Sequence, residues 1–254
     1  MGDWIAFWDS DHSIYVNARH RDVHYRTIAQ DIAQLVAQHT AKQIRALGPA
    51  GAAVLDYGCG EALHADIVAA TARRLILCEA APMVRGALAE RFAGNARIEV
   101  RAPDEVAALP AGSLDVVVLH SVAQYLAPNE LDGPLALFRR LLTGQGLLIL
   151  GDVIPPDVAA WTDAAELLRF AAANGFLGAA LVGLARTVLS DYWRLRSRLG
   201  LTRYGEAEII EKLARAGFSA SLAPRNIGHN TARMTFLASP TSDRLDFLDS
   251  EHDV

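Results

Sequence analysis

Polar side chains that can bind a ligand or exchange a proton stand at the ends of four predicted strands. They are Asp56, Glu79, Asp104 and His120. Carboxylates accept hydrogen bonds from hydroxyl and amine groups, and an imidazole titrates near neutral pH, so this set suits ligand binding and general-base chemistry. Ligands of open α/β sheets bind at the carboxyl ends of the strands, whereas polar groups inside a core would be costly. We therefore expect the four side chains to converge on one site.

A glycine turn follows the first of these strands. The segment 52–55 is short and apolar, Asp56 ends it, and Gly58 and Gly60 allow a tight turn in which the backbone approaches a ligand closely. A helical pattern begins directly after the turn, and a strand, a glycine turn and a helix N-terminus form a nucleotide-binding loop. Leu63 occupies the position of the third glycine of the dinucleotide fingerprint, which disfavours a pyrophosphate and leaves room for a ligand without phosphate.

The segment from Val54 to Gly60 resembles the first motif of class I S-adenosylmethionine (SAM) dependent methyltransferases. The usual form of that motif is hydrophobic-hydrophobic-Asp-hydrophobic-Gly-Cys-Gly, and the chain matches it residue for residue. The resemblance implies that SAM is the cofactor and S-adenosylhomocysteine (SAH) the product. It also implies that Gly58, Cys59 and Gly60 approach the amino-acid part of SAM, while Asp56 orients the loop or receives the SAM ammonium through water. The alternative is a structural strand–turn–helix unit that binds no ligand.

The same resemblance gives roles to acidic residues further along the chain. Glu79, 19 residues after Gly60, is placed with Ala80 like the acidic residue that accepts hydrogen bonds from ribose hydroxyls, and a carboxylate there disfavours the 2′-phosphate of NADP. Asp104 resembles the acidic residue that meets the adenine amino group. Glu105 is the alternative for that role, because the segment is longer than the common family spacing. Either side chain also suits a helix N-terminus.

His120 begins a segment, 120–126, that resembles the family's fourth motif, where the strand end faces the methionine part and the reacting methyl group. His120 is therefore the candidate general base for a hydroxyl acceptor, and the alternative is a packing residue. The asparagine–proline signature of nitrogen-modifying relatives is absent after this strand. Its absence argues against methylation of DNA amines and of protein glutamine.

The N-terminal segment is rich in aromatic residues and histidine, unlike a disordered tail. A helical pattern runs from about His20 to Leu47 and ends at Gly48-Pro49. Methyltransferases of this class commonly place an N-terminal helix over the SAM pocket, which implies that polar residues such as Arg19 and Tyr25 close the site. The alternative is a surface helix held by an aromatic staple.

Strands and helices alternate along the chain at the spacing of a doubly wound parallel sheet. The expected elements are helix 62–72, strand 75–78, helix 82–92, strand 98–101, strand 114–120, helix 131–142, a strand that begins at Leu147 after Gly144-Gln145-Gly146 and ends near Asp152, helix 206–216, strand 218–223 and strand 234–237. The connection 224–233 is too short for a crossover helix, so the last two strands should be antiparallel neighbours. The resemblance implies an α/β fold with a mostly parallel, seven-stranded, Rossmann-like sheet and an antiparallel last strand.

The same patterns divide the chain into regions. They are an N-terminal helical lid segment at 1–48, a SAM-binding core at 49–154 and 205–239, a helical insertion at 155–204 and a flexible tail at 240–254. The uncharged run 170–185 within the insertion is short for a membrane span. We expect the insertion to cap the acceptor pocket. The alternatives are a homodimer contact, or peripheral membrane contact through 170–198.

Composition narrows the classes of partner. Of the 254 residues 52% are hydrophobic, enough for a sizeable core, and the net charge of -5 does not indicate general affinity for nucleic acid. The two cysteines, Cys59 and Cys78, have no metal-site or disulfide spacing, which fits a reducing cytosol. Because residues 1–10 carry no cationic leader, we expect a cytoplasmic protein.

The sequence favours a SAM-dependent methyltransferase that acts on an oxygen, nitrogen or carbon of a small-molecule, lipid-like or saccharide-like acceptor. Such an enzyme needs little catalytic machinery, because it aligns the acceptor with an already activated methyl group and excludes water. The alternative is a non-catalytic SAM-fold binding or scaffolding protein that self-associates through 155–204. A third hypothesis is a nicotinamide-dependent oxidoreductase.

Overall fold

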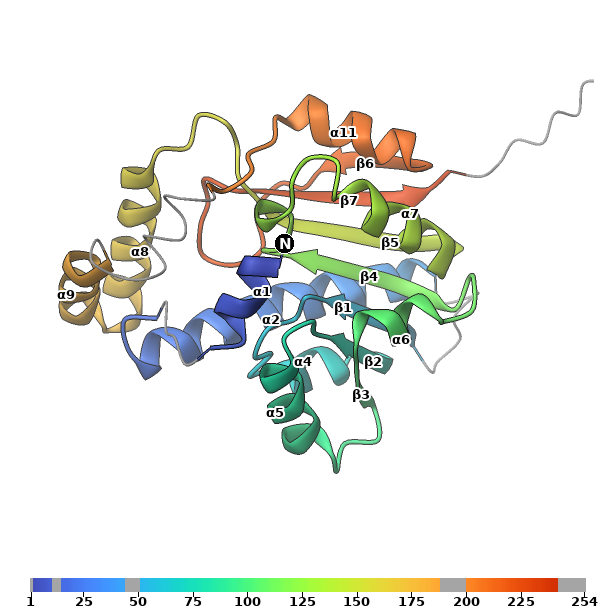
Figure 1. The fold of residues 1–254 in the computed structure, drawn as a ribbon, viewed down its shortest axis with the longest axis horizontal. Helices are drawn as coiled ribbons and strands as arrows, with labels where there is room; N and C mark the ends of the chain where they lie inside the picture. Colours follow the sequence, from blue (N-terminus) through green and yellow to red (C-terminus); the bar gives the residue numbers. More distant parts are fainter. Residues whose placement is uncertain (1, 11–14, 44–50, 188–199, 242–254) are drawn as a thin grey trace, which may run out of the picture.

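The computed structural model describes residues 2–10, 15–43, 51–187 and 200–241 (Figure 1). The helices are α1 (Gly2–Trp8), α2 (Ala18–Lys42), α4 (Ala65–Ala69), α5 (Pro82–Phe92), α6 (Pro103–Ala107), α7 (Asp132–Leu141), α8 (Ala160–Asn174), α9 (Leu177–Thr187) and α11 (Glu206–Arg215). The strands are β1 (Ala52–Tyr57), β2 (Ala72–Cys78), β3 (Ile98–Arg101), β4 (Leu114–His120), β5 (Leu142–Val153), β6 (Phe218–Leu222) and β7 (Met234–Pro240).

The strands form one seven-stranded sheet in the order β3-β2-β1-β4-β5-β7-β6. Strands β1 to β5 pair in parallel, and β7 runs antiparallel to both of its neighbours, β5 and β6. The predicted fold class, including the antiparallel pairing of the last two strands, is confirmed. The strand order reverses between β1 and β4, and ligands of open α/β sheets bind in the crevice at such a switch point.

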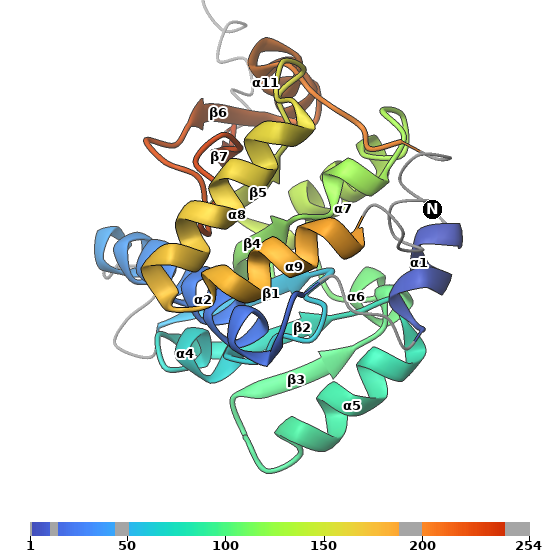
Figure 2. The same ribbon diagram turned by 90° about the vertical axis from the view of Figure 1, so that its left-hand side faces the viewer.

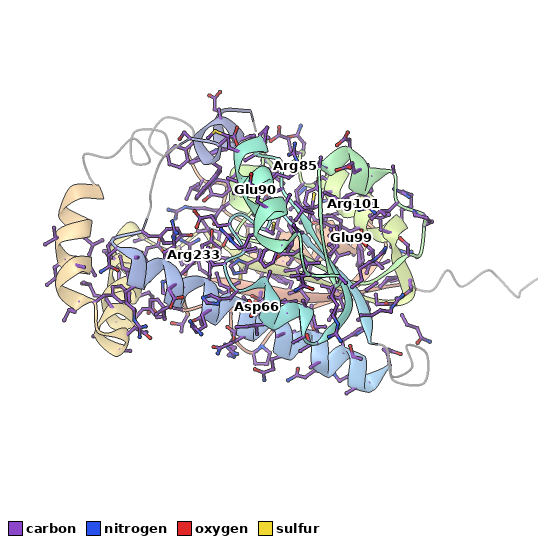
Figure 3. The ribbon with its side chains drawn as sticks, turned by 90° about the horizontal axis from the view of Figure 1, so that it is seen from below. Asp66, Arg85, Glu90, Glu99, Arg101 and Arg233 are labelled. Atoms are coloured by element: carbon purple, nitrogen blue, oxygen red, sulfur yellow. The ribbon has the colours of Figure 1, made fainter. Side chains whose placement is uncertain are left out.

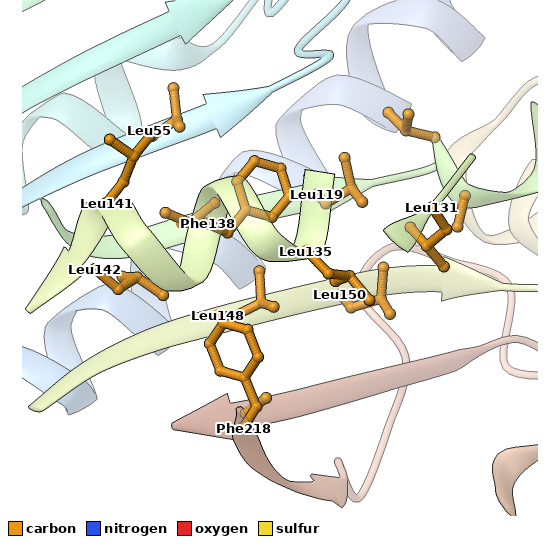
Figure 4. Close-up of a cluster of buried hydrophobic side chains, with 14 of the residues drawn as sticks. Leu55, Leu119, Leu131, Leu135, Phe138, Leu141, Leu142, Leu148, Leu150 and Phe218 are labelled. Atoms are coloured by element: carbon orange, nitrogen blue, oxygen red, sulfur yellow. The ribbon is translucent and has the colours of Figure 1, made fainter. Parts of the chain in front are cut away.

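Helices cover both faces of the sheet, because alternate residues of each strand point to opposite sides. In β1, Leu55 packs in the cluster that includes α7 and α11, whereas Val54 packs in the cluster that includes α2 and α4. Figure 4 shows the first cluster, in which Leu135 and Phe138 of α7 lie against the sheet. Burial on both faces explains why the inner strands are almost entirely apolar.

The carboxyl ends of the parallel strands are flanked by α1, the start of α2, and the pair α8 and α9 (Figures 1 and 2). In the view of Figure 2, α8 and α9 lie in front of the sheet. Both helices belong to the sequence region 155–204, whose residues 188–199, with the arginines at 194, 196 and 198, fall outside the described part of the chain. None of the helices in the described ranges is long and apolar enough to cross a bilayer.

Three elements differ from what the sequence predicted. The strand expected from Leu147 begins at Leu142, so residues 144–146 lie within β5, whose pairing with β4 shifts register there. Gly146 is needed in that irregular stretch, because a Cβ on it would lie 2.8 Å from Cδ2 of Leu142. The helix expected at 62–72 is only α4, since Ala62 has a left-handed φ of 41° and β2 already begins at Ala72. Helix α1 was not expected.

Candidate active site

A cavity of about 760 Å³ lies at the carboxyl ends of the strands. Its walls come from α1, α2, the glycine turn after β1, the ends of β2, β4 and β5, α8, and the connection between β6 and β7. The predicted site residues that line it are Asp56, Gly58, Cys59, Gly60, Glu79, Ala80, His120 and Tyr25. This volume lies in the upper part of the range for small-molecule pockets, so it suits a cofactor and a second ligand.

The glycine turn is fixed by the strand beside it. The N–H groups of Gly58 and Cys59 both donate to the carbonyl of Cys78, at 2.8 and 3.1 Å. Gly58 and Gly60 have φ values of 77° and 58°, which explains why glycine stands at both positions. A Cβ on Gly58 would lie 2.5 Å from Cγ2 of Val122, so the absence of a side chain there also lets the turn pack against the segment after β4.

Glu79 connects the glycine turn to the start of α5. Its Oε2 accepts a hydrogen bond from the N–H of Gly60 at 2.9 Å, and its Oε1 accepts one from Ala81 at 2.8 Å. The residue is only 9% exposed, yet it lines the cavity. Because each carboxylate oxygen can accept a second hydrogen bond, Glu79 is a rigid acceptor facing the ligand space.

Asp56 faces the cavity with a carboxylate that makes no hydrogen bond to any described residue. Burial, and then the negative charge of Glu79, raise the pKa of Asp56 to about 7. A cationic or hydrogen-bond-donating ligand would supply the missing partner and lower that pKa. Burial also raises the pKa of the Cys59 thiol well above its usual value, which disfavours the nucleophilic thiolate.

Tyr25 reaches the glycine turn from α2, whereas Arg19 does not. The Tyr25 hydroxyl accepts a hydrogen bond from the N–H of Glu61 at 3.3 Å and lies 3.2 Å from where a Cβ on Gly60 would be. Arg19 is exposed, donates to the carbonyl of Asn174 at 3.4 Å, and does not line the cavity. The first turn of α2 directs Arg19 away from the cavity, toward the end of α8.

The acidic residues expected near adenine lie in α6, outside the cavity. Asp104 and Glu105 are both exposed, and only Pro103 of this segment lines the cavity. The Oε2 atom of Glu105 accepts a hydrogen bond from the N–H of Ala102 at 2.7 Å. Glu105 thus caps the start of α6, which is the structural alternative that its position in the sequence left open.

His120 stands at the head of a hydrogen-bonded chain. Its Nδ1 lies 3.1 Å from the hydroxyl of Ser121, which donates to Oδ2 of Asp152 at 2.7 Å. Its Nε2 lies 3.5 Å from the carbonyl of Ile227. Burial lowers the pKa of His120, and the charge of Asp152 and the Ile227 carbonyl act in the opposite direction. Gly151 makes room for the ring, because a Cβ there would lie 2.8 Å from Cδ2 of His120.

Ser121 and Asp152 both have left-handed backbone conformations, with φ values of 57° and 60°. Such conformations are uncommon for residues other than glycine and are found at functional sites where the surroundings enforce them. The enforcing contacts are hydrogen bonds from the N–H of Ser121 to the carbonyl of Gly151 at 3.1 Å and from the N–H of Asp152 to Oδ1 of Asn226 at 3.1 Å. The strain places the two side chains face to face.

Several cavity residues were not predicted from the sequence. They are Trp4, Trp8, His20, His24, Ser121, Tyr125, Asp163, His229, Asn230 and Arg233. Trp4 packs on Tyr125 with a centroid distance of 4.6 Å, which closes one side of the cavity with α1. Arg233 donates to both carboxylate oxygens of Asp163 at 2.9 Å and so links the end of the sheet to α8. Two sequence signals pointed to parts of this set, the aromatic and histidine density near the N-terminus and the motif-like segment 120–126, but neither identified individual residues.

The methyltransferase-domain family matches residues 55–150. No curated protein matches the chain. Among solved structures, magnesium protoporphyrin IX methyltransferase (ChlM) from Synechocystis PCC 6803 with bound SAH has a TM-score of 0.54 at 20% identity, over 95% of this chain and 94% of that one.

Two further methyltransferase structures are similar. The trans-methyltransferase CalH complexed with SAH has a TM-score of 0.52 at 19% identity, over 82% of this chain and 55% of that one, so the chain spans only about half of CalH. The Burkholderia thailandensis 1,6-didemethyltoxoflavin-N1-methyltransferase has a TM-score of 0.53 at 16% identity, over 84% and 78%. At these identities the similarity establishes the fold. Residues 55–150, which begin within the glycine motif, therefore match a methyltransferase domain, and the rest of the chain shares the fold of these structures.

Proposed function

We propose that this protein transfers the methyl group of SAM to a hydroxyl oxygen of a small molecule. The observation that carries the choice of a hydroxyl is the chain His120–Ser121–Asp152, which can accept and stabilise a proton at the end of β4. A neutral amine would need no such base. The hydroxyl proton has to leave, and a positioned imidazole is the usual acceptor for it.

The cavity residues fit the proposed cofactor. Asp56 presents an unpartnered carboxylate to a ligand that carries an ammonium and a sulfonium charge, and Glu79 presents a fixed acceptor to hydroxyl groups. Asp104 and Glu105, which the family resemblance assigns to adenine, do not line the cavity, so we propose that Ala80 and Pro103 contact that end instead. When bound, SAM supplies a methyl carbon whose bond to sulfur breaks with the electron pair moving to sulfur.

His120 takes the proton in this proposal. Because Ser121 gives its only hydroxyl proton to Asp152, its oxygen must accept from Nδ1–H of His120. Nε2 is then the basic nitrogen of the neutral ring. Once Nε2 holds the acceptor's proton it can donate to the carbonyl of Ile227, so the charged ring has an acceptor on each nitrogen. The acceptor oxygen, freed of its proton, forms the new bond to the methyl carbon, giving a methyl ether and SAH.

The test combines binding and turnover. Calorimetry with SAM should show binding to the purified protein, and mass spectrometry should detect SAH and a product heavier by one methylene on a panel of hydroxylated metabolites. Binding without SAH formation on any acceptor would support the scaffolding alternative instead. Products methylated only on nitrogen or carbon would refute the hydroxyl proposal.

A further inference from the structure

Three imidazole rings line the cavity together at the end covered by α8. His20 and His24 come from α2, and His229 comes from the connection between β6 and β7. Their ring centroids lie 6.0 Å apart for His20 and His24, 5.6 Å for His24 and His229, and 6.4 Å for His20 and His229. We refer to these three residues as the histidine wall.

Aromatic rings support the histidine wall from behind. His229 stacks on Phe170 of α8, with centroids 4.2 Å apart and planes at 18°, and His20 stacks on Phe176, at 5.1 Å and 21°. Neither phenylalanine lines the cavity, so each covers the outer face of an imidazole. The ring centroid of Tyr15 lies 5.4 Å from the ring centroids of both His20 and His24, and Tyr15 lines the cavity. The three imidazole planes are inclined at 69–79° to one another, so a flat ligand can stack on one ring while the others present their edges and nitrogens to it.

Two rings of the wall have unused hydrogen-bonding capacity. His24 Nδ1 is buried and has no partner among the described residues, and the nitrogens of His229 make no hydrogen bond within the same ranges. By contrast, Nδ1 of His20 accepts a hydrogen bond from the N–H of Val16 at 3.3 Å. An unsatisfied buried polar atom is costly and calls for a partner, which a bound molecule can supply.

The wall does not have the chemistry of a metal or anion site. The histidine, cysteine and acidic side chains of the described residues form no group that could hold a metal ion. Burial is the main cause that lowers the pKa of all three imidazoles, for His20 to about 4, so the rings are neutral at pH 7. A neutral imidazole offers a donor and an acceptor but no charge to pair with phosphate or carboxylate.

The other charged groups around the cavity also disfavour an anion. Its lining contains five carboxylates and two guanidinium groups, from Asp56, Glu61, Glu79, Asp152, Asp163, Arg21 and Arg233. Of the two guanidinium groups, Arg233 is only 8% exposed and is already bound to both oxygens of Asp163, and Arg21 lies 3.5 Å from the Glu61 carboxylate. Figure 3 labels Arg233 on the side of the molecule nearer α8 and α9. An anionic acceptor would face net negative charge.

We infer that the histidine wall binds the methyl acceptor, and that this acceptor is a planar, uncharged aromatic compound whose hydroxyl oxygen accepts a hydrogen bond from an N–H of His24 or His229. The inference rests on the proposed function, and it adds the chemical class of the acceptor. A flat aromatic ligand can stack on one imidazole and meet the edges of the other two, and the unpaired nitrogens recognise its hydroxyl. The hydroxyl proton passes to His120 as described above, and the product is an aryl methyl ether.

The test measures binding of three probes to the SAH-saturated protein by calorimetry. The probes are 2-naphthol, its saturated analogue decahydro-2-naphthol, and 2-naphthoate. We expect 2-naphthol to bind at least tenfold more tightly than either of the others. His24→Phe keeps a ring and removes the nitrogens, so it should weaken 2-naphthol binding about tenfold while SAH affinity stays within twofold. His39→Phe, on the same helix but outside the cavity, is the matched control.

Two kinds of result would overturn the inference. The first is equal or tighter binding of the saturated alcohol or the naphthoate, and the second is unchanged 2-naphthol affinity in both His24→Phe and His24→Gln proteins that still bind SAH. These results would leave the methyltransferase proposal standing, whereas failure of the wild-type protein to bind SAM or SAH would remove that proposal itself. Retained SAH binding also shows that each variant is folded.

Discussion

Glu79 is held by two backbone N–H groups, one on each carboxylate oxygen, so it cannot swing away from the ligand space. We expect Glu79→Gln to weaken SAM binding, because the variant keeps the shape but loses a charge-assisted acceptor worth about 1.5–3 kcal/mol. That corresponds to roughly tenfold or more in the dissociation constant measured by calorimetry. Glu99→Gln, on β3 and paired with Arg101, is the control. A change below twofold in a folded Glu79→Gln protein would place Glu79 outside the cofactor site.

Asp152 acts on His120 through the hydroxyl of Ser121 and through its charge. Since the carboxylate raises the pKa of His120 against the lowering by burial, Asp152→Asn should lower that pKa further. A base with a lower pKa stays unprotonated at lower pH but removes protons less well. The acidic limb of kcat/KM should therefore move to lower pH, and kcat should fall by roughly 10²-fold.

Asp157→Asn is the matched control for this position, because Asp157 is exposed and lies just beyond β5. It should leave both the rate and the pH profile unchanged. A purely structural role for Asp152 would reduce the amount of folded protein without moving the acidic limb, and that outcome would contradict the proton chain.

Among the elements, the glycine turn and the segment after β4 form one packed unit. Gly58→Ala combines a left-handed φ with a Cβ only 2.5 Å from Val122, so the free energy of unfolding should fall by about 1–3 kcal/mol. Adding Val122→Ala should recover part of that loss, because it removes the clash but not the backbone strain. Urea unfolding of both single variants and the double variant measures the coupling. Strictly additive losses would show that the contact does not limit the turn.

The elements themselves were largely predictable. Helix Pro82–Phe92 and strands Ile98–Arg101 and Leu114–His120 have the predicted bounds, because apolar strands covered on both faces alternate with helices that begin at clear signals such as Pro82. The start of β5 was mispredicted because pairing with β4 extends the strand through Gly144 and Gly146, although glycine weakens strands. Helix α1 was missed because it is stabilised by tertiary contacts such as Trp4 on Tyr125.

The site was predictable only where one motif spans it. The glycine turn and Glu79 follow from spacing along adjacent strands, and both line the cavity. His24 and His229 lie on segments that only the folded chain brings together, and no periodicity links them. Glu105 was a site candidate that the structure places outside the cavity. An acidic residue after a strand also suits a helix cap, and Glu105 makes that contact with the N–H of Ala102.

At the scale of the whole molecule, α8 contributes Asp163 and Leu167 to the cavity wall, and α9 packs beside α8. Replacing 159–199 with a short glycine-serine linker should leave SAM binding nearly intact and abolish methyl transfer, since it removes Phe170 and Phe176 from behind the histidine wall. Thr202 is retained because its N–H donates to the carbonyl of Gln124 at 2.9 Å. Calorimetry and SAH formation are the measurements.

Light scattering and vesicle binding test the two alternative roles of the replaced segment, a homodimer contact and a membrane contact. A folded variant that changes from dimer to monomer with its activity kept would favour a homodimer contact. If the wild-type protein binds anionic vesicles and the linker variant does not, while the variant keeps its activity, a membrane contact through 170–198 is favoured. Either result would contradict the acceptor cap.

The ion pair between Asp163 and Arg233 fixes only one end of this cap. Asp163 lies in the first turn of α8, whereas Phe170 and Phe176 lie toward and beyond the other end. Separating two stacked rings and breaking the exposed 3.4 Å hydrogen bond from Arg19 to Asn174 costs less than breaking a bidentate pair that is largely shielded from solvent. We therefore expect α8 to rotate about its first turn at Asp163, with the largest displacement beside Phe176. The acceptor would then enter next to the rings that hold it.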